Sequence, residues 1–292
     1  MLFGAHVSSA GGISTAVDRA EAIGCDAVQV FTQSPRMWRP TSHTDEQVAR
    51  FRERRNEAGI AYVVCHALYL VNLASPDRDL HAKSIAALRA TLETADAIGA
   101  EAVVFHPGSH LGAGMDAGLG NVVSALRELL ELTSDRLWLL LENCAGAGGT
   151  IGRSLDELAA IVDALDAHPR LGVCLDSCHW WASGVDVTKP AALDAAVDEL
   201  DARVGLDRLR CLHVNDAASA LGSNVDRHAS MGRGLMGAKL SVFLSHPAFQ
   251  ELPAILETSA PGAHEIDVAE MQALRDLQRR GARNTRRRAA RH

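Results

Sequence analysis

Eight short apolar runs recur along the chain, and longer stretches with amphipathic periodicity separate them. Each run is four to six residues long and mostly aliphatic, which is typical of strands that are buried on both faces of a parallel sheet. The runs occupy residues 2–6, 27–31, 61–66, 102–106, 137–142, 173–176, 209–213 and 253–257. The pattern therefore predicts strands that alternate with helices.

The stretches between the runs carry the start and stop signals of helices. Residues 44–58 open with Thr44 and two acids, and residues 77–98 open at Asp77, so both predict capped helices. Gly24 and Gly99 each follow an Ala-Ile pair, where glycine supplies the left-handed conformation that ends a helix. Eight such units without a linker favour one (β/α)8 TIM-type barrel domain, over residues 1–280. A doubly wound open sheet is the alternative.

Two connections are too long to be simple turns. Residues 32–43 follow the second run and residues 214–237 follow the seventh, and neither has regular periodicity. Long loops in compact domains are usually functional or disordered. Both follow the carboxyl end of a predicted strand, where barrel enzymes build their sites.

Composition excludes several other classes of protein. The 292 residues are 47% hydrophobic and 22% charged, which excludes wholesale disorder. No apolar run approaches the roughly 20 residues that a membrane helix needs. The first residues lack a basic segment followed by an apolar one, so we expect no signal peptide and a cytoplasmic protein. The six cysteines of this long chain are expected to be buried free thiols.

The net charge of −7 is unevenly distributed along the chain. Residues 271–292 hold eight arginines and one aspartate, which leaves −14 on residues 1–270. Such an acidic body is unusual for a protein that binds nucleic acid. Residues 281–292 are Arg-rich and aperiodic, and we expect a disordered extension there. The alternative is that this tail adds salt-dependent affinity for phosphates.

Six consecutive apolar runs end on a residue type that binds metals. In a barrel these ends converge on one rim, where unpaired carboxylates repel one another unless cations lie between them. The six residues are His66, His106, Glu142, Asp176, His213 and Glu257. Imidazole and carboxylate ligands together suit a divalent transition metal, and zinc is the commonest occupant.

Two short pairs extend this set. His179 follows Asp176 by three residues, and Asp226 and His228 share one face if their loop is extended. The resulting five histidines and four carboxylates are too many for one ion and suit two or three. Three divalent cations would bring +6 against −4 from the carboxylates, so the rim would carry +2 and suit an anionic substrate such as a phosphodiester.

These ligand types favour metal-assisted hydrolysis. Clustered divalent ions activate water, bind phosphate oxygens and stabilise a leaving alkoxide. The sequence contains no nucleophile elbow and no phosphate-binding GxxxxGK[ST] loop. Covalent and nucleotide-driven chemistry therefore have no support.

Seven phrases of the sequence resemble the endonuclease IV family of metal-dependent apurinic/apyrimidinic (AP) endonucleases, in that family's order. They are GAHVS at 4–8, FHPGSH at 105–110, LEN at 141–143, GVCLDSCH at 172–179, HVND at 213–216, VDRH at 225–228 and ILET at 255–258. The resemblance runs from residue 2 to about residue 277.

The resemblance implies a TIM-type barrel that repairs double-stranded DNA in base excision repair. Such an enzyme cuts 5′ to an abasic site and leaves 3′-hydroxyl and 5′-deoxyribose phosphate ends. It implies three zinc ions per chain, with manganese as an alternative at one site. We further expect no organic cofactor, no membrane and, by default, a monomer, which would be associated with the nucleoid when it acts on DNA.

The resemblance also assigns the ligands. His66 and His106 resemble ligands of the first zinc, and Glu142 bridges it to the second and positions or deprotonates the nucleophile. The other ligands of the second zinc are Asp176, His213 and Glu257, and those of the third are His179, Asp226 and His228. In the family, water activated between the first two ions attacks phosphorus in line, and the third ion helps the 3′-oxygen to leave.

Further positions match residues that contact DNA or support the metals. Arg36, Tyr69 and Leu70 stand where the family inserts side chains into DNA and flips the abasic sugar out. His6, His110 and Asn215 are candidates to support the ligands or bind phosphate. The sequence departs from the family pattern at Ser34, Pro35, Ala67, Leu68, Ala229 and Arg233, which puts DNA contacts in doubt but not the metal ligands.

Two other functions fit a barrel of this type. A sugar isomerase or epimerase also places Glu, Asp and His on strand ends around one or two metals. The additional pair Asp226 and His228, without an obvious proton-shuttle lysine, argues against it. A DNA-lesion binder without catalysis is the second rival, but it should have lost some ligands, and this chain has lost none.

Overall fold

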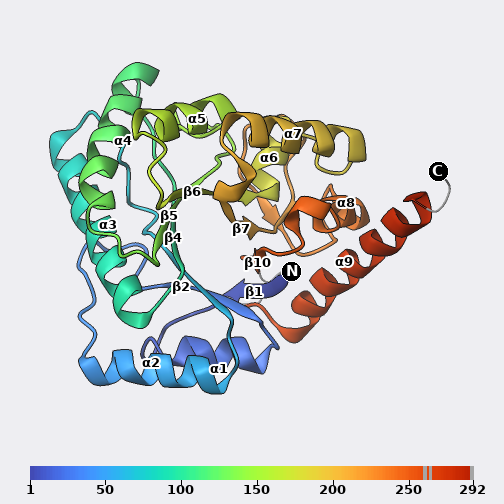
Figure 1. Cartoon of the computed structure of the whole chain (residues 1–292), viewed down its shortest axis with the longest axis horizontal. Helices are drawn as coiled ribbons and strands as arrows, with labels where there is room; N and C mark the ends of the chain where they lie inside the picture. Colours follow the sequence, from blue (N-terminus) through green and yellow to red (C-terminus); the bar gives the residue numbers. More distant parts are fainter. Residues whose placement is uncertain (259–261, 263–264, 290–292) are drawn as a thin grey trace.

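Eight parallel strands form a closed barrel in the computed structural model, which describes residues 1–258, 262 and 265–289 (Figure 1). The order around the barrel is β1-β10-β7-β6-β5-β4-β3-β2. The strands are β1 Leu2–His6, β2 Ala27–Phe31, β3 Tyr62–His66, β4 Ala102–Phe105, β5 Trp138–Glu142, β6 Leu171–Asp176, β7 Leu209–His213 and β10 Pro253–Leu256. This closed barrel confirms the predicted TIM-type fold and excludes the open sheet.

Helices surround the barrel and cover the outer face of its strands (Figure 1). They are α1 Thr15–Ala22, α2 Asp45–Glu57, α3 Arg78–Ile98, α4 Met115–Leu130, α5 Leu155–Ala164, α6 Ser177–Ser183, α7 Pro190–Arg203, α8 Ser241–Leu244 and α9 Val268–Ala289. Three short 3₁₀ turns complete the set, η1 Leu206–Arg208, η2 Gly237–Leu240 and η3 Pro247–Phe249.

The predicted helix boundaries rest on specific caps. The Thr44 hydroxyl accepts a hydrogen bond from the Gln47 amide, and the Gln47 side chain accepts one from the Thr44 amide, which completes a capping box at the start of α2. Asp77 caps α3 in a similar way. Gly99 ends α3 with a φ of 76°, which glycine adopts without strain.

An apolar layer fills the inside of the barrel directly below its carboxyl-terminal rim. Its members include Ala27, Val64, Val104, Leu140, Cys174, Cys211 and Ile255, all fully buried. Alternate residues of a strand face the same side, so the residue two positions later also points inward. Those later residues are Gln29, His66, His106, Glu142, Asp176, His213 and Glu257. The period of two therefore places one polar side chain, on or directly after each of seven strands, above the apolar layer.

All six cysteines are buried and unpaired, as predicted. Cys174 and Cys211 face each other on β6 and β7 within the apolar layer. Burial raises the pKa of the Cys174 thiol well above its usual value, because no solvent stabilises a thiolate there.

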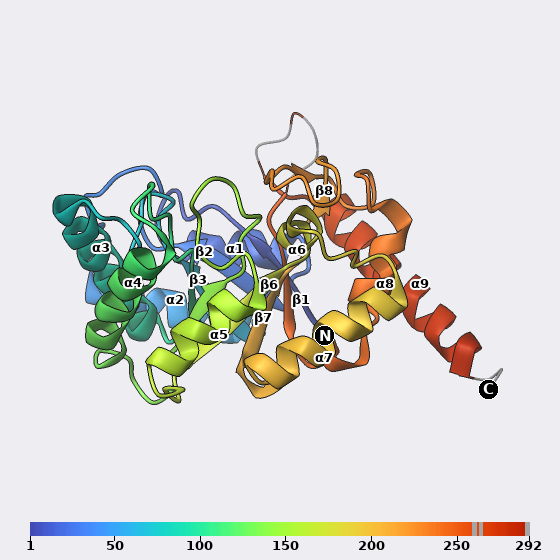
Figure 2. The same ribbon diagram turned by 90° about the horizontal axis from the view of Figure 1, so that it is seen from above.

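The long connection 214–237 is folded back on itself above the rim. Its strand β8 (Asp216–Ala217) pairs antiparallel with β9 (His228–Ala229), and β8 lies above the barrel in Figure 2. The buried Asp216 carboxylate accepts hydrogen bonds from the amides of Gly234, Met236 and Gly237, at 2.9–3.1 Å. The connection is therefore an ordered part of the rim, which its lack of periodicity did not indicate.

Helix α9 continues through residues 281–289, where the sequence pattern predicts an aperiodic, disordered extension. Arginine and alanine favour helices, and Gly281 lies so close to α8 that an added Cβ would overlap the Ser241 carbonyl oxygen. The predicted domain boundary at residue 280 thus falls inside a helix. Residues 290–292 of the predicted tail lie outside the described part of the chain. Among the described helices, none combines the length and the apolar character needed to cross a membrane.

Candidate metal centre

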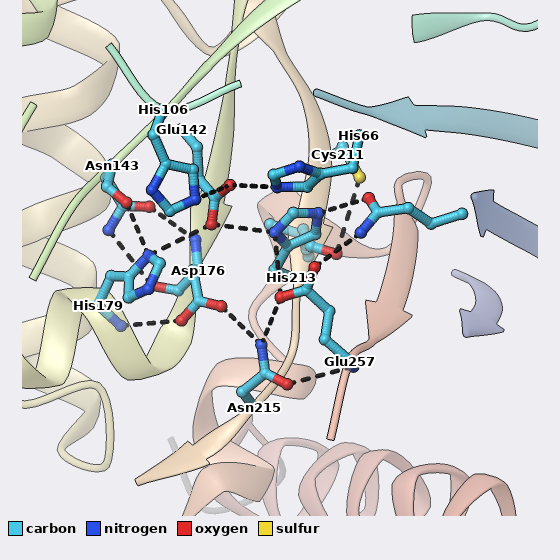
Figure 3. A network of polar contacts seen from close by, with 12 residues as sticks. His66, His106, Glu142, Asn143, Asp176, His179, Cys211, His213, Asn215 and Glu257 are labelled. Carbon is cyan, nitrogen blue, oxygen red and sulfur yellow. Dashed lines mark hydrogen bonds and ion pairs between the residues drawn. The ribbon is translucent and has the colours of Figure 1, made fainter. Parts of the chain in front are cut away.

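The nine predicted ligand residues meet at the carboxyl-terminal rim of the barrel, and Figure 3 shows seven of them, all except Asp226 and His228. Three sets of their nitrogen and oxygen atoms each lie within 4.8 Å of one another. These sets are His66, Glu142 and His213; Glu142, Asp176, His213 and Glu257; and His179, Asp226 and His228. His106 joins them through Glu142. One cluster therefore unites side chains that are far apart in the sequence.

Glu142 lies at the middle of the cluster and is almost fully buried. Its Oε2 is 3.0 Å from Nε2 of His106 and 3.2 Å from Nε2 of His66. Its Oε1 is 3.1 Å from Nδ1 of His213 and 3.3 Å from Nδ1 of His179. One carboxylate thus faces four imidazoles, as expected of a group that bridges two cations.

Backbone carbonyls fix the tautomers of two of these imidazoles. Nδ1 of His66 lies 2.7 Å from the Ala67 carbonyl, and Nδ1 of His179 lies 2.8 Å from the Asn143 carbonyl. Each Nδ1 must carry a proton to make that hydrogen bond, which leaves the lone pair on Nε2. The Nε2 atoms of these histidines in turn face the carboxylates of Glu142 and Asp226.

Gln29 of β2 fixes the opposite tautomer of His213. The amide nitrogen of Gln29 donates to Glu257 Oε1 at 2.7 Å, so its carbonyl oxygen is the atom 2.7 Å from Nε2 of His213. Nε2 therefore carries the proton, and the Nδ1 lone pair points between the carboxylates of Glu142 and Glu257, at 3.1 and 3.5 Å. Lone pairs facing carboxylates repel each other unless a cation or a proton lies between them.

Asp226 and His228 of the loop above the rim form the third set with His179. Nε2 of His179 is 3.2 Å from Asp226 Oδ2, and Nε2 of His228 is 3.1 Å from Asp226 Oδ1. Nε2 of His228 is buried, yet its geometry gives it no hydrogen bond within the described structure. A buried imidazole nitrogen without a hydrogen bond is in a suitable state to bind a metal ion.

Asp176 and Asn215 hold further parts of the cluster in place. Asp176 caps α6, since its Oδ1 accepts from the His179 amide at 2.8 Å. The side-chain amide of Asn215 donates to Asp176 Oδ2 at 2.6 Å and to Glu257 Oε2 at 3.1 Å. Asn215 thus keeps two carboxylates side by side.

The electrostatics of the cluster require positive charge. Within the described structure, no lysine or arginine forms an ion pair with Glu142, Asp176, Asp226 or Glu257. Burial opposes the ionisation of Glu142, but His106 and His213 outweigh it and hold the pKa of that carboxyl well below its usual range. Burial likewise lowers the pKa of His213, but Glu257 and Glu142 outweigh it and raise the value to about 10. The Glu142 carboxylate therefore stays ionised, and the nitrogen and oxygen donors of the cluster fit divalent cations.

The two remaining histidine candidates, His6 and His110, differ in whether they contact the cluster. His6 belongs to the centre: its Nδ1 is 2.9 Å from the Gln29 amide nitrogen and 3.8 Å from Glu257, and its buried Nε2 has no hydrogen bond within the described residues. The His110 ring instead accepts hydrogen bonds from the amides of Gly112 and Gly114. His110 therefore shapes the loop after β4, and none of its described contacts reaches a ligand.

Of the predicted DNA-contacting residues, Tyr69 lies at the opening of the centre and Arg36 lies near Tyr69. Tyr69 is 64% exposed, and its ring centroid lies 5.1 Å from that of Phe31 and 6.1 Å from that of His66. It lines a cavity of about 440 Å³ together with several of the nine ligands. Arg36 is exposed and near enough to Tyr69 to act on the pKa of its hydroxyl, while Leu70 is half-buried against the core.

The six departures from the family pattern differ in position. Ala67 and Leu68 are buried, so they pack the loop below Tyr69 rather than facing outward. Ser34 and Pro35 line a second cavity of about 710 Å³ that adjoins His6. Arg233 is exposed, and Ala229 pairs with Asp216 in the β8–β9 sheet.

Sequence reasoning missed Gln29 and Asn143. Gln29 is fully buried in the otherwise apolar run AVQVF, and the inward parity of that position could have revealed it. Asn143 directly follows Glu142; its side chain donates to the Asp176 carbonyl and accepts from the Asp176 amide. It thereby joins the ends of β5 and β6.

Comparison with known proteins gives matches over almost the whole chain. The AP endonuclease 2 family model, described as a xylose isomerase-like TIM barrel, matches residues 17–279. A protein named "Probable endonuclease 4" from Chloroflexus aggregans is 40% identical over 279 residues, which are 95% of this chain and 98% of that protein. The chain belongs to the endonuclease IV family. A second "Probable endonuclease 4", from Geobacter sulfurreducens, is 39% identical over 95% of this chain and 94% of its own.

Solved structures agree with this family assignment. Endonuclease IV from Thermus thermophilus has a TM-score of 0.84 and 38% identity, and the match covers 96% of this chain and 100% of that one. A D-tagatose 3-epimerase-like protein has a TM-score of 0.74 at 19% identity, over 99% and 100% of the two chains. That second likeness concerns the fold alone.

Proposed function

We propose that this member of the endonuclease IV family is a hydrolase that cuts the DNA phosphodiester 5′ to an abasic site. The products are a 3′-hydroxyl and a 5′-deoxyribose phosphate, and the reaction belongs to base excision repair. The observation that carries the proposal is the convergence of imidazole lone pairs on carboxylates, with the buried Glu142 at their centre, without a neutralising lysine or arginine among the described residues. Membership of the family supports DNA as the substrate.

We assign the donor sets to three zinc ions, with manganese as an alternative at one of them. His66, His106 and Glu142 would hold the first. Glu142 would also hold the second, together with Asp176, His213 and Glu257. His179, Asp226 and His228 would hold the third. When bound, such ions supply an activated water and neutralise charge on the phosphate and on the leaving oxygen.

Glu142 has a distinct role in this scheme. In the metal-free centre burial opposes its ionisation, but the histidines around it hold the pKa of its carboxyl below its usual range. Bound cations would favour the ionised form in the same way, so Glu142 would accept a hydrogen bond from an attacking water. Because the Glu142 side chain is buried, it has almost no freedom to rotate, and its fixed position would orient that water.

The opening of the centre suits an extruded sugar. Tyr69 is held edge-on by Phe31, with interplanar angle 74°, and presents an exposed ring beside the cavity. An aromatic ring at that place can stack on a base or fill the gap left in the helix, and an abasic nucleotide costs least to extrude. Arg36 adds a positive charge next to Tyr69 for a flanking phosphate.

A duplex with one tetrahydrofuran abasic analogue tests the proposal. The zinc-loaded protein should cut it once, on the 5′ side, and end analysis should find a 3′-hydroxyl. Glu142→Gln should keep the fold and bind the duplex but cut it at least about 100-fold more slowly. If the loaded wild-type protein leaves the duplex intact but epimerises ketoses, the activity is that of the epimerases that share this fold.

A further inference from the structure

Helix α9 carries its arginines to the end of the barrel opposite the metal centre. Arg275 donates to the Gly24 carbonyl, pairs with Asp26 at 3.6 Å and lies 5.5 Å from the Phe3 ring. These partners lie at the amino-terminal ends of β2 and β1, so residues after 275 extend past that end. In Figure 2, α9 runs away from β8 and the rim loops, and its end projects at the lower right of the molecule.

The last turns of α9 have one packed side and one open side. Gly281 lies against the Ser241 carbonyl of α8, and Gln278 donates to Gln250 at 3.0 Å. At about 100° per residue, Arg279, Arg283 and Arg286 lie within about 60° of one another on the opposite side, and Arg280 borders them. We call these four exposed residues the arginine face.

Little negative charge neutralises the arginine face. Arg279 pairs with Asp276, whereas no carboxylate in the described part of the chain is within ion-pair distance of Arg280, Arg283 or Arg286. Asp194 of the adjacent helix α7 is paired with His246 at 3.2 Å. The face thus concentrates unpaired guanidinium groups on a body whose residues 1–270 carry −14.

We propose that the arginine face is a second, sequence-independent binding surface for duplex DNA. Guanidinium groups bind phosphates well, and their fixed row spans about 10 Å along the helix. The segment from Arg279 to Arg286 contains no large apolar side chain, so it lacks the core that a stable protein interface needs. A polyanion therefore fits this face better than a second copy of the chain.

The position of the face has a further implication for how DNA is held. Since α9 runs away from β8 and the rim loops towards its carboxyl end, a short duplex that is held at the metal rim leaves the arginine face open. The molecule can therefore hold two DNA segments at once, or keep one segment while the rim engages another. This inference depends on the proposed function only in taking DNA as the polyanion.

The test compares two triple variants of the full-length, zinc-loaded protein. R280Q/R283Q/R286Q removes the unpaired charges of the face, and R52Q/R127Q/R136Q removes the same charge from exposed arginines elsewhere. The probe is an undamaged duplex, whose binding is measured by fluorescence anisotropy from about 0.05 to 0.2 M salt. The face variant should bind at least about tenfold more weakly at about 0.1 M, with a salt slope smaller by up to about 3.

Two controls separate this inference from the proposed function. Cleavage of a short abasic duplex should change less than twofold in the face variant, so failure of cleavage in all proteins would count against the function alone. In a second control, the short abasic duplex first occupies the metal rim of the Glu142→Gln variant. This variant should still bind the undamaged probe, and it should lose that binding when the three arginines of the face are also replaced. An unaltered salt slope, an equal loss in the control triple, or a dimer that the face variant dissociates in sedimentation would each overturn the proposal.

Discussion

The carbonyl oxygen of Gln29 lies 2.7 Å from Nε2 of His213 and fixes which nitrogen of that imidazole carries the proton. Gln29→Leu removes this acceptor, and His213 can then turn or change tautomer. Because groups that orient a ligand typically contribute about 10- to 100-fold to metal affinity, we expect a loss of about that size at the site that includes His213. Competition with a chelator of known zinc affinity measures it.

Gln272→Leu is the matched control, since Gln272 lies exposed on α9 and belongs to none of the donor sets. It should keep wild-type zinc affinity. Equal affinities of the Gln29 variant and the wild type would show that Gln29 only fills space in the barrel.

Removal of the metals should reverse the pH dependence of stability above neutrality. Burial lowers the pKa of His213, but Glu257 and Glu142 outweigh it and raise the value to about 10, from 6.5 in the unfolded chain. In the metal-free protein, this protonated histidine stabilises the fold below about pH 6.5, and the contribution is lost as pH rises towards about 10. In the loaded protein the histidines bind cations in the neutral form, so higher pH strengthens the site.

Thermal unfolding of chelator-stripped and zinc-loaded protein across this pH range measures the effect. The gap between their midpoints should widen as pH rises from about 6.5 to about 10. A constant gap would show that protons do not replace the cations in the empty site.

Tyr69→Ala should weaken DNA binding without weakening the fold. The Tyr69 ring is 64% exposed, so its removal loses little packing. Stacking on a base is worth about 1–3 kcal/mol, which corresponds to an affinity for the abasic duplex lower by about 5- to 150-fold. Leu132→Ala, at an exposed apolar residue after α4, is the control and should change neither binding nor melting. An unchanged affinity would remove Tyr69 from the DNA interface.

Asp216→Ala should disturb the third donor set although Asp216 is not one of its members. The change leaves the amides of Gly234, Met236 and Gly237 without their carboxylate acceptor, and β8 then no longer fixes β9, which begins at His228. Loss of such buried hydrogen bonds should lower the free energy of unfolding by about 2–4 kcal/mol. Zinc content should fall by about one equivalent per chain, as measured by atomic absorption.

The exposed Asp163 of α5 offers the comparison, and Asp163→Ala should leave both stability and zinc content as they are. Full zinc content in the Asp216 variant would show that the loop holds His228 by other contacts.

The sequence predicted the barrel and the convergence of the candidate ligands because both follow from one regularity. An inward-facing apolar residue such as Leu140 is followed two positions later by Glu142, and the same step recurs on neighbouring strands. The carboxyl ends of parallel strands converge in a barrel, so the sequence pattern alone was enough to predict that these side chains lie close together.

Other features depend on contacts that no local pattern carries. Gln29 resembles any polar residue in a core strand until Glu257 and His213 are seen beside it. The β8–β9 pairing joins two-residue strands that are too short to show alternation. The helical form of residues 281–289 also depends on packing, since Gly281 fits α8 only because it lacks a side chain.

The donor sets are assembled from both ends of the chain, and this has a consequence for biosynthesis. The set around His213 needs Glu257, which directly follows the last barrel strand, and its orientation needs Gln29 from the second. A chain still being synthesised can hold neither arrangement, so high-affinity zinc uptake should follow closure of the barrel. Ligand binding that is restricted to the closed form stabilises that form by mass action. Metal binding would thus stabilise only the complete, closed barrel. A truncated chain would gain neither this stabilisation nor the catalytic activity of the metal centre.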